Sequence, residues 1–89
     1  MEATSVRIIL TAVADNNPSQ IHPGEPAAVV AWLKQHTWLK GGDKGREAQY
    51  HPEIEAAARA AERAFALFGR GEVESARPLA LEALKMFSG

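Results

Sequence analysis

Apolar residues recur at helical spacing in four segments of the chain, and clusters of glycine, proline and polar residues separate these segments. Positions three and four residues apart lie on one face of an α-helix, so this periodicity predicts amphipathic helices. The predicted helices cover residues 5–14, 26–40, 52–68 and 72–87. We therefore expect an all-α fold, a compact bundle of three to four helices that forms a single domain over residues 1–89.

The first predicted helix carries a regular apolar stripe, made by Val6, Ile9, Leu10 and Val13. Thr4 is the expected N-cap, because its hydroxyl can accept a hydrogen bond from a free amide of the first turn. A strand is the alternative for this segment, since Ile8 and Ile9 are β-branched. Residues 15–24 are rich in turn-forming residues and predict a connector, which Ile21 would anchor.

The second predicted helix, Pro26–Lys40, has proline at its first position, where the missing N–H costs no hydrogen bond. Gly41 and Gly42 are expected to end this helix, because glycine readily adopts the left-handed conformation that caps a C-terminus. Residues 41–49 contain three glycines and predict a flexible loop.

The third and fourth predicted helices are joined by Gly69–Gly71 and are expected to form an antiparallel hairpin, with the second helix packed across it. Pro78 lies inside the fourth helix, where it removes one hydrogen bond and clashes with the preceding turn. The helix is therefore kinked at Pro78, or its regular part starts near this residue. The predicted core comprises large apolar residues, namely Trp32, Leu33, Ile54, Phe65, Phe68, Leu84 and Phe87.

Residues 57–89 resemble a single tetratricopeptide repeat, a helix-turn-helix unit of 34 residues. Ala64 and Ala76 occupy the small positions of its two helices, Gly71 occupies the turn, and Ala83–Leu84 matches the closing pair. The segment departs from the family at Ala60, where the family has tryptophan. The resemblance implies two antiparallel helices that approach to about 8 Å.

The composition limits the classes of function. The net charge is −1, with 10 basic and 11 acidic residues, which argues against a dedicated nucleic-acid binder. The chain has no cysteine, so disulfides, thiolate catalysis and cysteine zinc sites are excluded, and a cytoplasmic location is expected. The apolar stretch 6–14 is too short to cross a membrane, which takes about 20 apolar residues.

Three histidines are the candidate imidazoles for catalysis or metal binding. His22, His36 and His51 lie on three different predicted elements rather than one helical turn apart. We expect His36 to be a half-buried, hydrogen-bonded residue of the second helix. The sequence contains no phosphate-loop or nucleophile-elbow motif. It therefore predicts no enzymatic activity, no metal site and no cofactor.

Two sets of residues are the candidates for binding a partner. The first set is Trp38, Lys40, Lys44 and Arg46, in and beside the glycine-rich loop. Tryptophan and arginine are enriched at binding hot spots. The second set is Leu79 and Met86, which form an additional apolar line on the fourth helix and belong either to an interface or to a wider core.

These observations predict a small protein-binding adaptor, inhibitor or regulator. Its expected partner is another protein that forms a larger complex, and a homodimer of this chain is the alternative assembly. A compact inhibitor of a host machine, of the kind that phages and mobile elements encode, would have this size. The alternative is a nucleic-acid-associated protein that uses the basic loop at residues 40–46.

Overall fold

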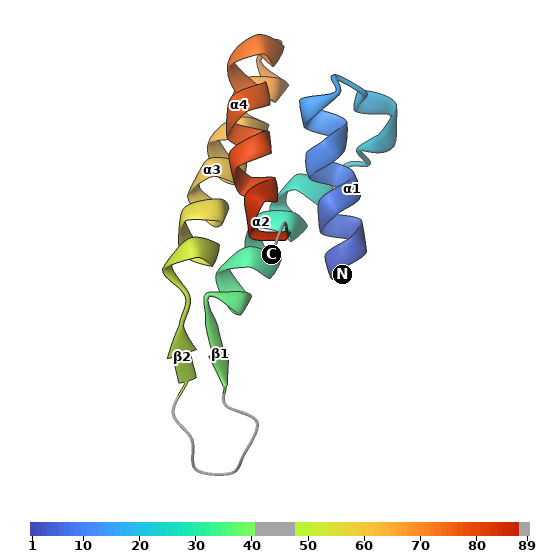
Figure 1. Cartoon of the computed structure of the whole chain (residues 1–89). Helices are drawn as coiled ribbons and strands as arrows, with labels where there is room; N and C mark the ends of the chain where they lie inside the picture. Colours follow the sequence, from blue (N-terminus) through green and yellow to red (C-terminus); the bar gives the residue numbers. More distant parts are fainter. Residues whose placement is uncertain (41–47, 88–89) are drawn as a thin grey trace.

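The computed structural model describes residues 1–40 and 48–87, with the backbone alone for residues 38–40 and 48–49. Four α-helices dominate this part of the chain and confirm the predicted all-α bundle (Figure 1). A short antiparallel pair of strands extends from one end of the helices. The elements are α1 (Ala3–Ala14), η1 (Pro18–Gln20), α2 (Glu25–His36), β1 (Trp38–Lys40), β2 (Ala48–Tyr50), α3 (Pro52–Gly69), α4 (Val73–Leu84) and η2 (Lys85–Phe87).

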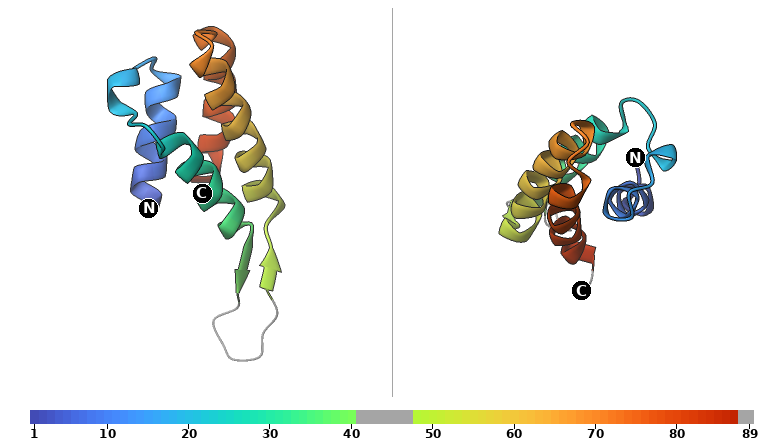
Figure 2. Two further views of the ribbon diagram at one scale, coloured as in Figure 1. Left: turned by 180° about the vertical axis from the view of Figure 1, so that it is seen from behind. Right: turned by 90° about the horizontal axis from the view of Figure 1, so that it is seen from above.

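Helices α3 and α4 form the antiparallel hairpin that the sequence predicts, and they share the most extensive contact in the fold. Helix α2 packs against α3, and α1 packs against α4 (Figure 1). Seen from above, α1 lies on the α4 side of the hairpin, away from α3 (Figure 2). The hairpin is therefore the central unit to which the two N-terminal helices attach on different sides.

Small residues line the contact between the two helices of the hairpin. Ala64 of α3 and Ala76 and Ala80 of α4 are completely buried, and they form one apolar cluster with Val13 and Ala14 of α1. Alanine side chains allow helix backbones to approach closely, so the hairpin packs tightly without large side chains at its centre.

A second apolar cluster joins all four helices. Its largest fully buried side chains come from the two N-terminal helices and are Val6, Ile9, Leu10, Val29 and Leu33. Ile54 is also buried, while Trp32, Phe65, Leu84 and Phe87 are half-buried and pack against this cluster. Phe68 is half-buried against the first cluster. The expected core residues are thus all placed against the core, but the stripe of α1 contributes more to its centre than the aromatic residues do.

Two helices end in the same local hydrogen-bonding pattern. At the end of α3, the amide of Gly71 donates to the carbonyl of Phe68, and the amide of Glu72 donates to the carbonyl of Leu67. Gly71 has a φ of 82°, as this Schellman motif requires. Helix α1 ends in the same way, with Asn16 at a φ of 51° in the place of the glycine. These ends follow from local sequence.

Helix α1 begins earlier than the sequence indicates. It starts at Ala3, its N-cap residue is Glu2, and no side chain caps it. Thr4 lies inside the first turn, so the prediction of Thr4 as the N-cap is wrong. The strand alternative for this segment is also wrong, because Val6, Ile9, Leu10 and Val13 form a continuous buried helical face. Ile21 is half-buried against both apolar clusters and anchors the connector as predicted.

The prediction that the second helix continues to Lys40 is wrong. Helix α2 ends at His36, and Trp38–Lys40 forms strand β1, which pairs with β2 in the register Trp38↔Tyr50. Residues 48 and 49, expected in a loop, belong to β2. The buried Thr37 ends the helix: its hydroxyl donates to the Leu33 carbonyl, and its own carbonyl accepts a hydrogen bond of 2.8 Å from the His51 amide. This pairing joins residues far apart in the sequence and is invisible to local periodicity.

Helix α4 begins at Val73 and runs continuously through Pro78 to Leu84. The alternative that its regular part starts near Pro78 is therefore wrong. The ring of Pro78 is exposed, and the hydrogen bond it removes lies close to the N-terminus of the helix. The last three residues of the predicted helix, Lys85–Phe87, form a 3₁₀ turn.

The tight contact of the hairpin can be tested by overpacking. We expect Ala64→Leu to lower the free energy of unfolding by about 1–3 kcal/mol, because the added atoms have no space between α3 and α4. Ala66→Leu is the matched control, since Ala66 is exposed on the same helix. Its effect should stay within about 0.5 kcal/mol. Urea unfolding measures both, and equal stability of the two variants would contradict the close packing at Ala64.

Candidate functional site

An apolar hollow on the described surface lies between α2 and α3. Its volume is about 400 Å³, and its lining is mainly hydrophobic. This volume is at the lower end of the range of about 300–1,000 Å³ that ligand pockets occupy. The lining residues are Pro26, Ala27, Val30, Ala31, Lys34, Glu62 and Phe65. We refer to this hollow as the α2–α3 groove.

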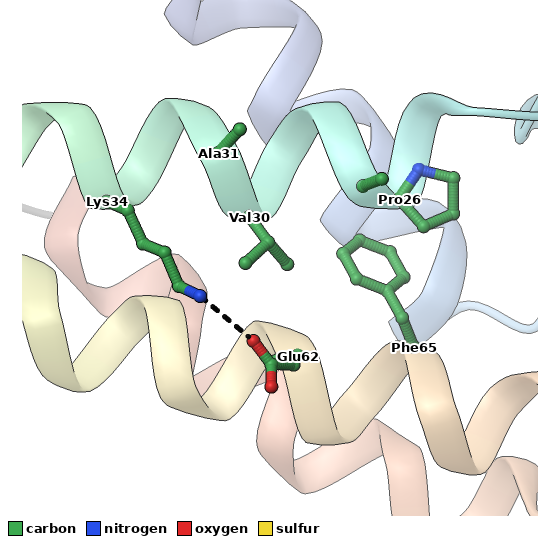
Figure 3. A pocket seen from close by; sticks show the side chains of 7 residues that line it. Pro26, Val30, Ala31, Lys34, Glu62 and Phe65 are labelled. Atoms are coloured by element: carbon green, nitrogen blue, oxygen red, sulfur yellow. Dashed lines mark ion pairs between the residues drawn. The ribbon is translucent and has the colours of Figure 1, made fainter.

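Each helix contributes a different part of the groove. Pro26 and Val30 of α2 point toward α3, and the ring of Phe65 rises from α3 toward Pro26 (Figure 3). Phe65 also packs against both apolar clusters, so the core holds the ring in place. Ala27 and Ala31 are exposed and leave the groove open. The result is an accessible apolar surface with a rigid aromatic wall.

An ion pair forms one end of the groove. The Nζ atom of Lys34 lies 3.4 Å from Oε2 of Glu62 and links the two helices (Figure 3). Both side chains are about two-thirds exposed, so the pair contributes little to stability. Beyond it, a further hollow is lined by Lys34, Arg59, Glu62 and Arg63. The groove therefore passes from an apolar part to a charged part along the same two helices.

The structure describes two of the four residues in the first sequence-predicted binding set. Trp38 and Lys40 are both in strand β1, where Trp38 pairs with Tyr50 and Lys40 with Ala48 in the backbone ladder. Lys44 and Arg46 lie outside the described residues. The binding role of this set stays a prediction.

Leu79 and Met86 are placed against the core. Leu79 is half-buried against the cluster around Ala80, and Met86 is half-buried against the cluster around Leu33. The two side chains thus pack on different clusters rather than forming one exposed line. Leu81, between them, is 47% exposed. This packing makes both residues part of a wider core, and their role in binding a partner stays a prediction.

His36 stacks within an aromatic cluster. Its ring lies 3.8 Å from that of Trp32, and its Nδ1 atom lies 2.7 Å from the Trp32 carbonyl oxygen, to which it donates. Trp32 also stacks on Phe87, with 6.3 Å between the ring centres. The guanidinium of Arg7 lies 5.9 Å from the centre of the Phe87 ring. His36 is therefore the half-buried, hydrogen-bonded residue expected from the sequence. The aromatic cluster ties η2 to α1 and α2.

His51 is the residue that precedes α3. Its Nδ1 atom lies 3.0 Å from Oε1 of Glu53. The pKa of Glu53 is lowered, first by a hydrogen bond from its own backbone amide at the start of α3 and then by the hydrogen bond from His51. His22 lies in the connector before α2, where its amide donates to the Glu25 carboxylate at 2.6 Å. The three imidazoles thus belong to separate local arrangements.

The described residues offer no set of three metal-ligating side chains that could hold an ion. None of the described helices has the length and apolar character that a bilayer crossing requires.

The groove was missed by the sequence analysis, although the sequence contains a signal for it. The first turns of α2 are apolar on nearly every side, from Pro26 to Ala31. A helix that is apolar all round has more than one surface to cover. Val29 faces the core, so Val30 and Ala31 on the other side indicate a second contact.

The burial of Leu79 and Met86 predicts a cost in stability. We expect Leu79→Ser and Met86→Ser each to lower the free energy of unfolding by about 1–2 kcal/mol, about half the value for a fully buried side chain. Leu81→Ser is the matched control and should change stability by less than about 0.5 kcal/mol. If all three variants unfold at the same urea concentration, the packing of Leu79 and Met86 on the core is not as described.

The lowered pKa of Glu53 predicts a pH-dependent contribution to stability. A carboxyl with a depressed folded-state pKa stabilises the fold above its ordinary pKa of 4.5, and this contribution is lost as the pH falls through the folded value. Glu53→Gln should therefore lower stability at neutral pH, and the difference from wild type should shrink in acid. Urea unfolding of wild type and Glu53→Gln, from neutral pH down through the folded-state pKa of Glu53, measures this difference in stability. Glu82→Gln, at an exposed position of α4, is the control for the removal of one surface carboxylate.

Comparisons of the chain with protein-family models, with curated proteins and with solved structures find no match. The hairpin implied by the resemblance to a tetratricopeptide repeat is present, and the family relationship stays a prediction. The function is therefore argued from the groove and its surroundings.

Proposed function

We propose that this protein is a small non-enzymatic regulator, an adaptor or inhibitor, that binds another protein through the α2–α3 groove. The observation that supports this proposal is the accessible apolar lining of Pro26, Val30 and Phe65 between two helices that are otherwise packed on the core. Burial of apolar surface is the main favourable term in most protein association.

The form of the groove favours a protein segment over a small polar substrate. Its polar groups are the side chains of Lys34 and Glu62, which lie at one end and pair with each other. A site for a small substrate usually directs several polar groups at the ligand to fix its orientation. An apolar groove between two helices suits the apolar face of a partner helix, which inserts side chains one turn apart.

The histidines support a binding role because their described contacts are internal. His36 is held by Trp32, and His51 is paired with Glu53 beside the start of α3. Each contact explains the residue as part of the fold. Both hydrogen bonds involve the Nδ1 atom of the imidazole and link the ring to a residue near a helix end.

The proposal is tested by polar substitution on the exposed side of the groove. We expect Ala27→Gln with Ala31→Gln to weaken partner binding by about tenfold or more, because the amides would have to be buried against the partner without hydrogen bonds. Glutamine is a good helix former, so α2 should keep its stability. The measurement is affinity capture from lysate of the source cell on the immobilised chain, with nuclease, followed by titration of the purified partner.

The matched control carries Ala3→Gln and Thr11→Gln, two exposed positions on α1 outside the groove. A stoichiometric partner that binds wild type and this control, but not the groove variant, supports the proposal. A partner that binds all three chains equally contradicts it. Capture that disappears with nuclease also contradicts it and favours a nucleic-acid-associated protein, the alternative that the sequence leaves open.

A further inference from the structure

We infer that the partner presents an amphipathic helical segment with an apolar anchor for the groove and carboxylates within about two helical turns of it, which meet Arg59 and Arg63. This inference rests on the proposed function and specifies the chemistry of its occupant. It follows from the distribution of charge along α2 and α3.

Basic side chains dominate the hollow beside the apolar part of the groove. Three of its four lining residues, Lys34, Arg59 and Arg63, are basic, although the whole chain has a net charge of −1. The positive charge is thus concentrated locally. Complementary charge across an interface supplies specificity and steers the approach of the partner.

The existing ion pairs leave one of these charges uncompensated. Lys34 pairs with Glu62 at 3.4 Å, and Arg59 pairs with Glu55 at 2.7 Å. Arg63 has no ion-pair partner within residues 1–40 and 48–87 and is exposed. Exposed pairs are weak, so Arg59 can exchange its partner for an approaching carboxylate at little cost. A carboxylate beside Arg63 and Arg59 would balance the excess charge.

The positions of these residues set the spacing in the occupant. Phe65 and Arg59 are six residues apart on α3, which corresponds to about 9 Å along the helix. Pro26 and Lys34 are eight residues apart on α2, or about 12 Å. A helix that follows the groove covers these distances in about two turns. The carboxylate that meets Arg59 should therefore lie about six to eight positions from the apolar anchor. The one that meets Arg63 should lie closer to the anchor, because Arg63 is two residues, or about 3 Å, from Phe65.

An unbiased peptide selection tests this inference. Displayed random peptides of about 16 residues, which span about 24 Å as a helix, are selected on the immobilised full chain. Peptides that also bind the Ala27→Gln, Ala31→Gln variant are removed, so that the remaining pool depends on the groove. We expect this pool to contain apolar residues three or four positions apart, followed or preceded at the predicted spacing by Asp or Glu.

Charge reversal then measures the electrostatic part with one peptide from this pool. Arg59→Glu with Arg63→Glu should weaken its binding about tenfold, as read by fluorescence anisotropy. Arg70→Glu with Arg77→Glu changes the net charge equally on exposed positions outside the groove, and its effect should remain within about twofold. Raising the salt from about 0.05 M to about 0.5 M should weaken binding to wild type more than to the Arg59, Arg63 variant.

The outcomes separate this inference from the proposed function. A groove-dependent pool without acidic enrichment, or one that both charge-reversed chains bind equally, overturns the acidic occupant and leaves the groove as a docking site. The absence of any groove-dependent pool overturns both. A pool that carries the predicted anchor and acids, and that loses affinity only on Arg59→Glu with Arg63→Glu, supports both.

Discussion

The close contact between α3 and α4 is the interaction on which the rest of the fold depends. A chain of 89 residues buries a smaller fraction of its surface on folding than a larger domain does, so its core is thin. The alanines at the centre of the hairpin, Ala64, Ala76 and Ala80, compensate by allowing the two helices to pack closely. Helices α1 and α2 then attach to different sides of this unit and add the larger buried side chains.

The groove is a consequence of the attachment of α1 and α2 to different sides of the hairpin. Helix α1 packs on α4, and α2 packs on α3, with little contact between α1 and α2. The side of α2 that faces away from the core is therefore left uncovered along α3. Phe65 serves both surfaces, because it packs on the buried clusters and also forms the wall of the groove. A residue that the core holds rigid loses little conformational freedom when a partner binds to it, which favours binding.

Two kinds of contact surround this surface and have different roles. The aromatic cluster of Trp32, His36 and Phe87 ties the C-terminal turn to α2 on the core side. The ion pairs along α2 and α3 are exposed and add little stability. In the proposed complex, they supply the pattern of charge that meets the partner. Stability and the proposed recognition thus depend on different faces of the same two helices.

The sequence by itself determined the helices and most of their ends, because these depend on short-range interactions. Periodic apolar residues, Pro26 and Pro52 at helix starts, and Gly71 and Asn16 at helix ends all act within a few residues of their own position. The hairpin between α3 and α4 also follows from local features, namely two adjacent helices joined by a short turn.

Tertiary structure alone decided the remaining features, because each one depends on residues that are distant in the sequence. The sequence predicts helix for Trp38–Lys40, but pairing with Ala48–Tyr50 makes this segment a strand. Leu79 and Met86 form an additional apolar line by sequence, whereas in the structure each is half-buried against a different cluster. The groove exists because packing leaves one side of α2 exposed beside Phe65, and periodicity identifies the apolar sides of a helix without indicating which of them a neighbour will cover.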